Sequence, residues 1–251
     1  MGMVAHPLLV VEHEAQCPPG WLGEWLVEAG ARLHVCRPYL GDRLPADLTA
    51  YAGMLVLGGA MGANDDDDHP WLAEVRALIA GAARERTPVL GVCLGHQLAA
   101  VALGGSVDPN PLGSQVGVLE IGWVEGAADD ELLGEAAGRP TPARALQWND
   151  DVVTSLPPGA VLLARTARDE VQAARLAPSV WGIQWHPEVD EQIIATWAEN
   201  DRDAAEERGL DVDGLIHAVA GARADLHRTW GPLARRFARL CDRHPSQADA
   251  R

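Results

Sequence analysis

Short apolar runs alternate with helical patterns through the first hundred residues, and this alternation limits the possible folds more than any other feature. The apolar runs lie at residues 7–11, 32–36, 54–57 and 88–92, and the helical patterns at residues 21–29 and 71–83. Strands that alternate with helices build a mainly parallel sheet with helices on both faces. The sequence therefore predicts an α/β fold.

The second half of the chain continues this sheet and then becomes helical. Further strands are predicted at residues 116–124, 161–163, 171–176 and 180–184. Because no flexible linker or internal repeat interrupts residues 1–190, we expect one domain there. Helical patterns at 191–200 and 212–241 predict an extension over residues 191–242 that packs on the core. It serves either as a structural cap or as an interface for a partner or a second copy. Polar residues 243–251 are expected to form a disordered tail.

Charge and cysteine usage exclude several classes of function. The formal net charge of −16 argues against nucleic acid as a partner, since binding phosphate backbones requires clustered Lys and Arg. No segment approaches the ~20 apolar residues of a membrane span, and no secretory signal is present. The four cysteines form no CxxC pair, so neither a metal site nor a disulfide framework is predicted. We expect a cytoplasmic protein.

One cysteine lies in a pattern typical of enzyme nucleophiles. Gly91-x-Cys93-x-Gly95 falls between a predicted strand and a predicted helix. Flanking glycines permit a sharp strand-to-helix turn that leaves the central side chain exposed at the helix N-terminus. Unpaired N–H groups there favour an anion, and thus a reactive thiolate. The alternative, a buried structural cysteine, is less consistent with the glycines.

A second motif follows the last predicted strand. His186 is a candidate general base and acid, and Glu188, two residues later, can accept a hydrogen bond from its other ring nitrogen. An isolated His-Pro-Glu is also typical of a surface turn. The two motifs together favour a Cys-His-Glu catalytic triad.

These residues resemble a known family. The stretch from Gly91 to Gln97 is similar to the nucleophile elbow of class I glutamine amidotransferases, and the stretch from Gln184 to Glu188 to their His-x-Glu motif. With Leu57-Gly58-Gly59, the resemblance covers roughly residues 4–190 and is strongest to the GMP synthase amidotransferase domain. It implies a flavodoxin-like fold and an enzyme without a cofactor.

The resemblance also implies further site residues. The N–H groups of Gly59 and Leu94 would form an oxyanion hole, although a plain turn at Gly59 is the alternative. Gln97 would contact the substrate, and the backbone from Gln115 to Gly117 would hold its α-amino and carboxylate groups. Many members have Pro in place of Ala60, which leaves the loop conformation open.

Two other polar stretches receive weaker interpretations. Asp65 to Asp68 is expected to be a solvated lead-in to a helix, since it lacks the ligand spacing of a calcium or magnesium loop. Residues 147–150 form either a loop at the rim of the active site or a packing element built on Trp148. Asn149 stands where several relatives carry a histidine, so that role does not transfer.

Three functions remain open at this point. The first is a glutamine amidotransferase that releases ammonia from glutamine for a synthetase on a separate chain. The second is a hydrolase of γ-glutamyl amides, such as those of polyamine breakdown or folate polyglutamates, with the same triad. The third is a non-catalytic binding module that has kept the fold. Turnover of glutamine, of γ-glutamyl compounds, or of neither would distinguish them.

Overall fold

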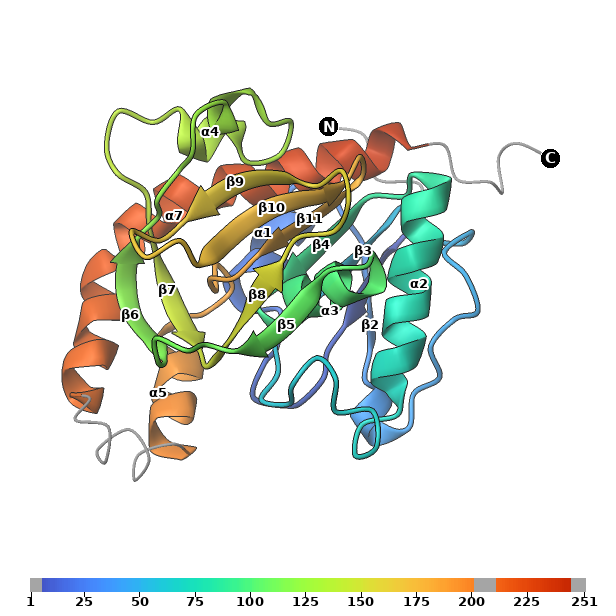
Figure 1. Ribbon diagram of the computed structural model, residues 1–251, viewed down its shortest axis with the longest axis horizontal. Helices are drawn as coiled ribbons and strands as arrows, with labels where there is room; N and C mark the ends of the chain where they lie inside the picture. The colour runs from blue at the N-terminus through green and yellow to red at the C-terminus, as the bar shows by residue number, and fades with distance from the viewer. Residues whose placement is uncertain (1–5, 201–210, 245–251) are drawn as a thin grey trace.

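The computed structural model describes residues 6–200 and 211–244, and a seven-stranded sheet forms its centre (Figure 1). In spatial order the strands are β2 (Leu33–Cys36), β1 (Leu8–Val11), β3 (Gly53–Val56), β4 (Val89–Val92), β11 (Val180–Ile183), β10 (Val171–Ala177) and β9 (Val161–Arg165). The first five are parallel, and β10 and β9 are added antiparallel. The predicted mainly parallel α/β fold is confirmed.

Helices cover both faces of this sheet. Helix α1 (Gly20–Glu28) and helix α7 (Val212–Arg243) pack on one face, and α2 (Trp71–Glu85) and α3 (Leu94–Ala102) on the other. Side chains of β1 alternate between the two faces, as the pleat of a strand requires. Because both faces are covered, the central strands are continuously apolar.

Two short antiparallel ladders extend the fold beside the sheet. Strand β5 (Ser106–Pro109) pairs with β8 (Asp151–Ser155), and β6 (Gln115–Glu120) with β7 (Arg144–Asn149). The predicted strand over residues 116–124 is too long, because only an isolated bridge at Trp123 continues beyond β6. Strands β5, β7 and β8 were not predicted. Their polar residues hide the usual alternation of apolar side chains.

The remaining short elements lie in connections. They are η1 (Pro38–Leu40), η2 (Ala127–Asp129) and α4 (Gly134–Ala137).

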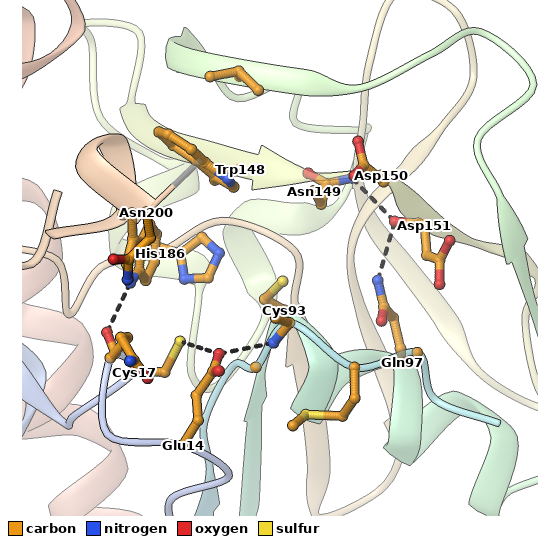
Figure 2. A pocket seen from close by; sticks show the side chains of 17 residues that line it. Glu14, Cys17, Cys93, Gln97, Trp148, Asn149, Asp150, Asp151, His186 and Asn200 are labelled. Carbon is orange, nitrogen blue, oxygen red and sulfur yellow. Dashed lines mark hydrogen bonds between the residues drawn. The ribbon is translucent and has the colours of Figure 1, made fainter. Parts of the chain in front are cut away.

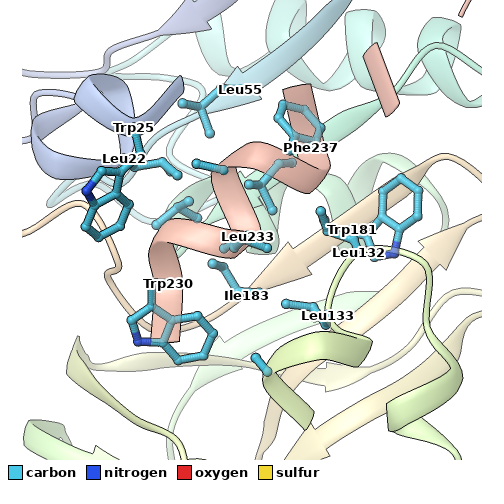
Figure 3. Close-up of a cluster of buried hydrophobic side chains, with 14 of the residues drawn as sticks. Leu22, Trp25, Leu55, Leu132, Leu133, Trp181, Ile183, Trp230, Leu233 and Phe237 are labelled. Carbon is cyan, nitrogen blue, oxygen red and sulfur yellow. The ribbon is translucent and has the colours of Figure 1, made fainter. Parts of the chain in front are cut away.

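The C-terminal helices belong to the core of the molecule. Helix α5 (Glu191–Asn200) matches its predicted range, and α7 extends the predicted helix by two residues to Arg243. Trp230, Leu233 and Phe237 of α7 are buried against the sheet (Figure 3). Residues 245–251 of the expected tail lie outside the described residues. Within the described ranges, no helix combines the length and apolar character that crossing a membrane requires.

Candidate active site

Two neighbouring parallel strands bring the candidate nucleophile and base together. Strand β4 pairs with β11, so that Val92 lies opposite Ile183 at their carboxyl ends. Cys93 follows directly, and its backbone N–H donates to the carbonyl of Ile183 at 2.8 Å. His186 comes three residues after β11, and Figure 2 shows its ring near the sulfur of Cys93. Ligand sites at such carboxyl ends are a general feature of parallel sheets.

The backbone at Cys93 has the strained turn that the glycine spacing predicts. The predicted exposure of its side chain is wrong, because Cys93 is buried and only 7% exposed. Cys93 has a φ of +49° and stands immediately before the first residue of α3. A Cβ on Gly91 would lie 2.3 Å from the carbonyl oxygen of Gly95, and one on Gly95 would lie 2.1 Å from that of Val56. Neither position accepts a side chain. The close packing of the backbone around both glycines enforces the strained turn, which places the thiol at the N-terminus of α3.

His186 and Glu188 form a buried pair. Nδ1 of His186 and Oε1 of Glu188 are 2.6 Å apart, and both side chains are almost fully buried. Burial alone would lower the pKa of His186, but the charges of Glu188 and Cys93 outweigh it and raise this pKa to about 10. The ring therefore favours its protonated form. Such an imidazolium stabilises a neighbouring thiolate.

Two contacts fix the orientation of His186. Its backbone N–H donates to the carbonyl of Leu146 in β7 at 2.8 Å. The ring of Trp197, from α5, packs against the imidazole at an interplanar angle of 74° with a centroid separation of 4.8 Å. Trp197 carried no sequence signal as a site residue, because its apolar helical spacing is equally typical of core.

Gly58 occupies the narrow space between the candidate nucleophile and base. A Cβ at this position would lie 3.1 Å from Cε1 of His186 and 3.7 Å from Cβ of Cys93. Any side chain would press on the imidazole. Gly58 is thus needed because its lack of a side chain leaves room for the imidazole of His186.

The two predicted oxyanion donors lie beside Cys93. Gly59 lines the cavity, and Leu94 is the first residue of α3, where helix N–H groups are unpaired. Ala60 follows Gly59, and its N–H donates to Oε1 of Glu14 at 2.8 Å. A proline has no N–H to donate. The residue that departs from the common family pattern therefore anchors the loop through a contact that proline lacks.

Gln97 is part of a buried amide network. Its Nε2 donates to the carbonyl of Asp151 at 3.0 Å and contacts Oε1 of Gln184 at 3.4 Å. Nε2 of Gln184 in turn approaches Sγ of Cys93 at 3.4 Å. The sequence interpretation assigned Gln184 no role, although a glutamine at the end of a buried strand is unusual enough to attract attention.

Gln115 and Gly117 are less directly placed. Between them, Val116 lines the cavity, whereas neither Gln115 nor Gly117 is among the lining residues. Gln115 is buried, and Gly117 has a φ of +131°. Their assignment to the substrate stays a prediction about backbone atoms.

A cavity of about 600 Å³ opens above Cys93 (Figure 2). Its lining combines three acidic side chains, two tryptophans, amides and the sulfur atoms of two cysteines. The residues are Glu14, Gln16, Cys17, Gly59, Ala60, Met61, Gly62, Cys93, Gln97, Val116, Trp148, Asn149, Asp150, Asp151, His186, Trp197 and Asn200. This size is typical of a small-molecule site.

The structure revises one of the two polar stretches, residues 147–150, whereas residues 65–68 are mostly exposed and precede α2, as expected. Residues 147–149 belong to β7 and not to a loop, yet Trp148 both lines the cavity and packs against Trp197. Asp65 accepts from the N–H of Gly62, and Asp66 pairs with Arg76. Among the described residues, no group of His, Cys, Asp or Glu has the arrangement of a metal site.

Together, the doubly covered parallel sheet and the cysteine elbow beside a His-Glu pair define an amidotransferase-type hydrolase fold. A family model described as glutamine amidotransferase class-I matches residues 21–196. The chain therefore belongs to the class I glutamine amidotransferases, a family of hydrolytic enzymes.

Individual relatives agree with this assignment. The chain is 39% identical over 120 residues to one subunit of the glutamine-hydrolyzing GMP synthase of Methanosarcina barkeri, across 45% of this chain and 59% of the relative. It is 32% identical over 149 residues to γ-glutamyl peptidase 4 of Arabidopsis thaliana, across 59% and 58%. The alignments span less than two thirds of either relative.

Solved structures resemble the whole described fold. A glutamine amidotransferase from Methylobacillus flagellatus superposes with a TM-score of 0.83 at 27% identity, over 95% of this chain and 96% of that one. A glutamine amidotransferase from Thermotoga maritima gives a TM-score of 0.82 at 25% identity, over 93% and 98%. The predicted flavodoxin-like class I fold is confirmed.

Proposed function

We propose that this protein hydrolyses the side-chain amide of glutamine through a thioester on Cys93. The observation that carries the proposal is the position of Cys93, at a strained elbow beside the buried His186–Glu188 pair. In this arrangement His186 holds the proton of the thiol, and Glu188 fixes the tautomer and orientation of the ring. The carboxylate also stabilises the imidazolium.

The reaction takes two steps. The thiolate of Cys93 attacks the γ-carbonyl carbon, and the N–H groups of Gly59 and Leu94 stabilise the oxyanion. The C–N bond breaks as His186 protonates the departing ammonia. A water molecule, deprotonated by His186, then attacks the thioester, which releases glutamate and restores the thiol.

We further propose that the ammonia serves a synthetase on a separate chain. Support comes from the similarity to a protein named as one subunit of a glutamine-hydrolyzing GMP synthase. The acceptor of the nitrogen is left open by this similarity. The exposed face of α7 is a candidate docking surface, because this helix follows the matched residues 21–196.

A second candidate function is hydrolysis of larger γ-glutamyl amides by the same triad. The size of the cavity favours it. Even if each heavy atom of free glutamine occupied the ~30 Å³ of a liquid water molecule, glutamine would fill only about half of the cavity. The similarity to γ-glutamyl peptidase 4 points the same way.

The test measures glutamate release by the purified protein from glutamine and from a panel of γ-glutamyl amides, together with release of ammonia from glutamine and of the amine from each amide. Wild type is compared with Cys93→Ala, and with Cys36→Ala as a control for a buried cysteine that does not line the cavity. Release that disappears only in Cys93→Ala supports the proposal. If both variants keep the wild-type rate, the assignment of Cys93 as nucleophile is wrong.

A further inference from the structure

One wall of the cavity carries hydrogen-bond acceptors and negative charge. Asn149, Asp150 and Asp151, at the junction of β7 and β8, form this acceptor wall. Glu14 adds a further carboxylate on another side of the cavity. Among the described lining residues there is no Lys or Arg, and the only basic side chain is His186, which is already paired with Glu188.

Asn149 contributes a buried acceptor that the protein leaves unused. Asn149 as a whole residue is only 6% exposed. The amide nitrogen donates to the carbonyl of Asp151 at 3.1 Å, which fixes the orientation of the group. Its Oδ1 has no hydrogen-bond partner within the described residues. In Figure 2, the side chain of Asn149 lies on the same wall of the cavity as Trp148. An unsatisfied buried acceptor is costly unless a ligand completes it.

The carboxylate of Asp151 lies in a strongly negative environment. Burial raises its pKa, and the charges of Asp150, Asp65 and Asp108 raise it further. Such a clustered negative potential attracts a cation and repels an anion. Asp150 is held in place by the hydroxyl of Ser114. The acceptor wall therefore has side chains held in fixed positions and carries negative charge.

We propose that this acceptor wall binds an ammonium group on the leaving amine of a γ-glutamyl amide. An ammonium carries three N–H donors, which match Oδ1 of Asn149 and the two neighbouring carboxylates. The inference rests on the proposed function and specifies its substrate class as γ-glutamyl amides of diamines or polyamines.

The reaction itself is unchanged by this assignment. Cys93 attacks the γ-carbonyl, the C–N bond breaks, and His186 protonates the departing nitrogen of the amine. Water hydrolyses the thioester, so that one γ-glutamyl amide and one water give glutamate and one amine. The distal ammonium takes no part in the chemistry and contributes to binding only.

Three amides of similar length test the assignment. They are the γ-glutamyl amides of putrescine, pentylamine and γ-aminobutyrate, whose leaving groups end in a cation, a neutral group and an anion. We expect kcat/KM to fall in that order, with roughly a tenfold advantage of the cationic over the neutral amide. Equal values for the first two, or a preference for the anionic amide, would overturn the proposal.

Variants localise the effect to the wall. Asp151→Asn is expected to remove most of the cationic preference, measured as the ratio of kcat/KM for the putrescine amide to kcat/KM for the pentylamine amide. Asp67→Asn makes the same change of charge at an exposed position that does not line the cavity, and it should keep the preference. If Asp151→Asn slows all three amides equally, the wall holds the α-ammonium common to them, and the proposal is wrong.

A binding measurement separates this inference from the proposed function. Titration calorimetry with Cys93→Ala and the uncleaved amides reports affinity without chemistry. Tighter binding of the putrescine amide than of the pentylamine amide supports the ammonium subsite. If wild type nevertheless cleaves none of the amides, the proposed hydrolysis is wrong and the subsite stands. If the amides are cleaved but the putrescine and pentylamine amides show no difference in affinity or kcat/KM, the ammonium subsite is wrong and the proposed hydrolysis stands.

Discussion

The carboxylate of Glu14 accepts a hydrogen bond from the backbone N–H of Ala60 at 2.8 Å, and so ties the loop after β1 to the loop after β3. The same oxygen also accepts from the thiol of Cys17 at 3.2 Å. Because Ala60 directly follows Gly59, this bond fixes the strand end that carries one proposed oxyanion donor. A glutamate far away in the sequence thereby orients the loop.

We predict that Ala60→Pro lowers kcat with little change in KM, because the loop loses its anchor to Glu14. A displaced oxyanion donor costs on the order of tenfold to a hundredfold in rate. Glu14→Ala should have a similar effect, and Glu14→Gln, which keeps an acceptor oxygen, should restore most of the rate. Steady-state kinetics on the best substrate measure all three.

The double variant tests whether the two residues act through one bond. If they do, Glu14→Ala adds almost nothing in the Ala60→Pro background. Fully additive losses would show that Glu14 acts elsewhere in the cavity.

The elbow glycines should contribute strongly to the stability of the fold. A Cβ on Gly95 would lie 2.1 Å from the carbonyl oxygen of Val56, so Gly95→Ala is expected to destabilise the protein by roughly 3 kcal/mol. Gly81 is a matched control inside α2, where a Cβ has room. There, Gly81→Ala should stabilise by up to about 1 kcal/mol. Urea unfolding of both variants measures the difference, and a harmless Gly95→Ala would contradict the described elbow.

The pair of His186 and Glu188 should make the free energy of unfolding fall as the pH rises into the alkaline range. The pKa of His186 in the folded state, about 10, lies above its ordinary value of 6.5. The protonated ring therefore contributes stability that is fully present below pH 6.5 and is lost as the pH rises through about 10. Glu188→Gln removes the charge that raises this pKa.

We expect Glu188→Gln to lower the free energy of unfolding by roughly 3 kcal/mol at pH 6, and by progressively less toward pH 10. Denaturant unfolding of both proteins across this range measures the difference. A difference that grows with pH would mean that the folded-state pKa of His186 is not raised.

Two other buried histidines should lower the stability of the fold at acidic pH. Burial lowers the pKa of His13 and of His96 to about 3, and both side chains are fully buried. Between about pH 3 and 6.5 the unfolded chain binds a proton at each position and the folded chain does not. Stability is therefore present above pH 6.5 and is lost as the pH falls, by about 1.4 kcal/mol per pH unit for each histidine.

The variant His96→Gln tests this contribution. It should flatten the fall in unfolding free energy between pH 6.5 and 5, whatever its effect on stability at pH 7. An unchanged slope in His96→Gln would show that folding does not lower the pKa of His96.

Features that depend on neighbouring residues could be predicted from the amino-acid sequence alone. The apolar runs at β1, β3, β4 and β11 predicted the parallel sheet, because strands buried on both faces need continuous apolar side chains. The elbow around Cys93 could also be predicted, because such a tight turn requires glycines close to it in the sequence, here two residues before and two residues after the cysteine. The spacing of His186 and Glu188 predicted their pairing for the same local reason.

The distant residues that complete the site became visible only in three dimensions. Pairing of β4 with β11 brings Cys93 and His186 together, and Glu14 reaches Ala60 from another strand end. The acceptor wall around Asn149 lies on strands whose polar residues hid them from the sequence pattern. The physical reason is that strand order and side-chain packing depend on contacts between distant segments, whereas turns and periodicity are set by neighbours along the chain.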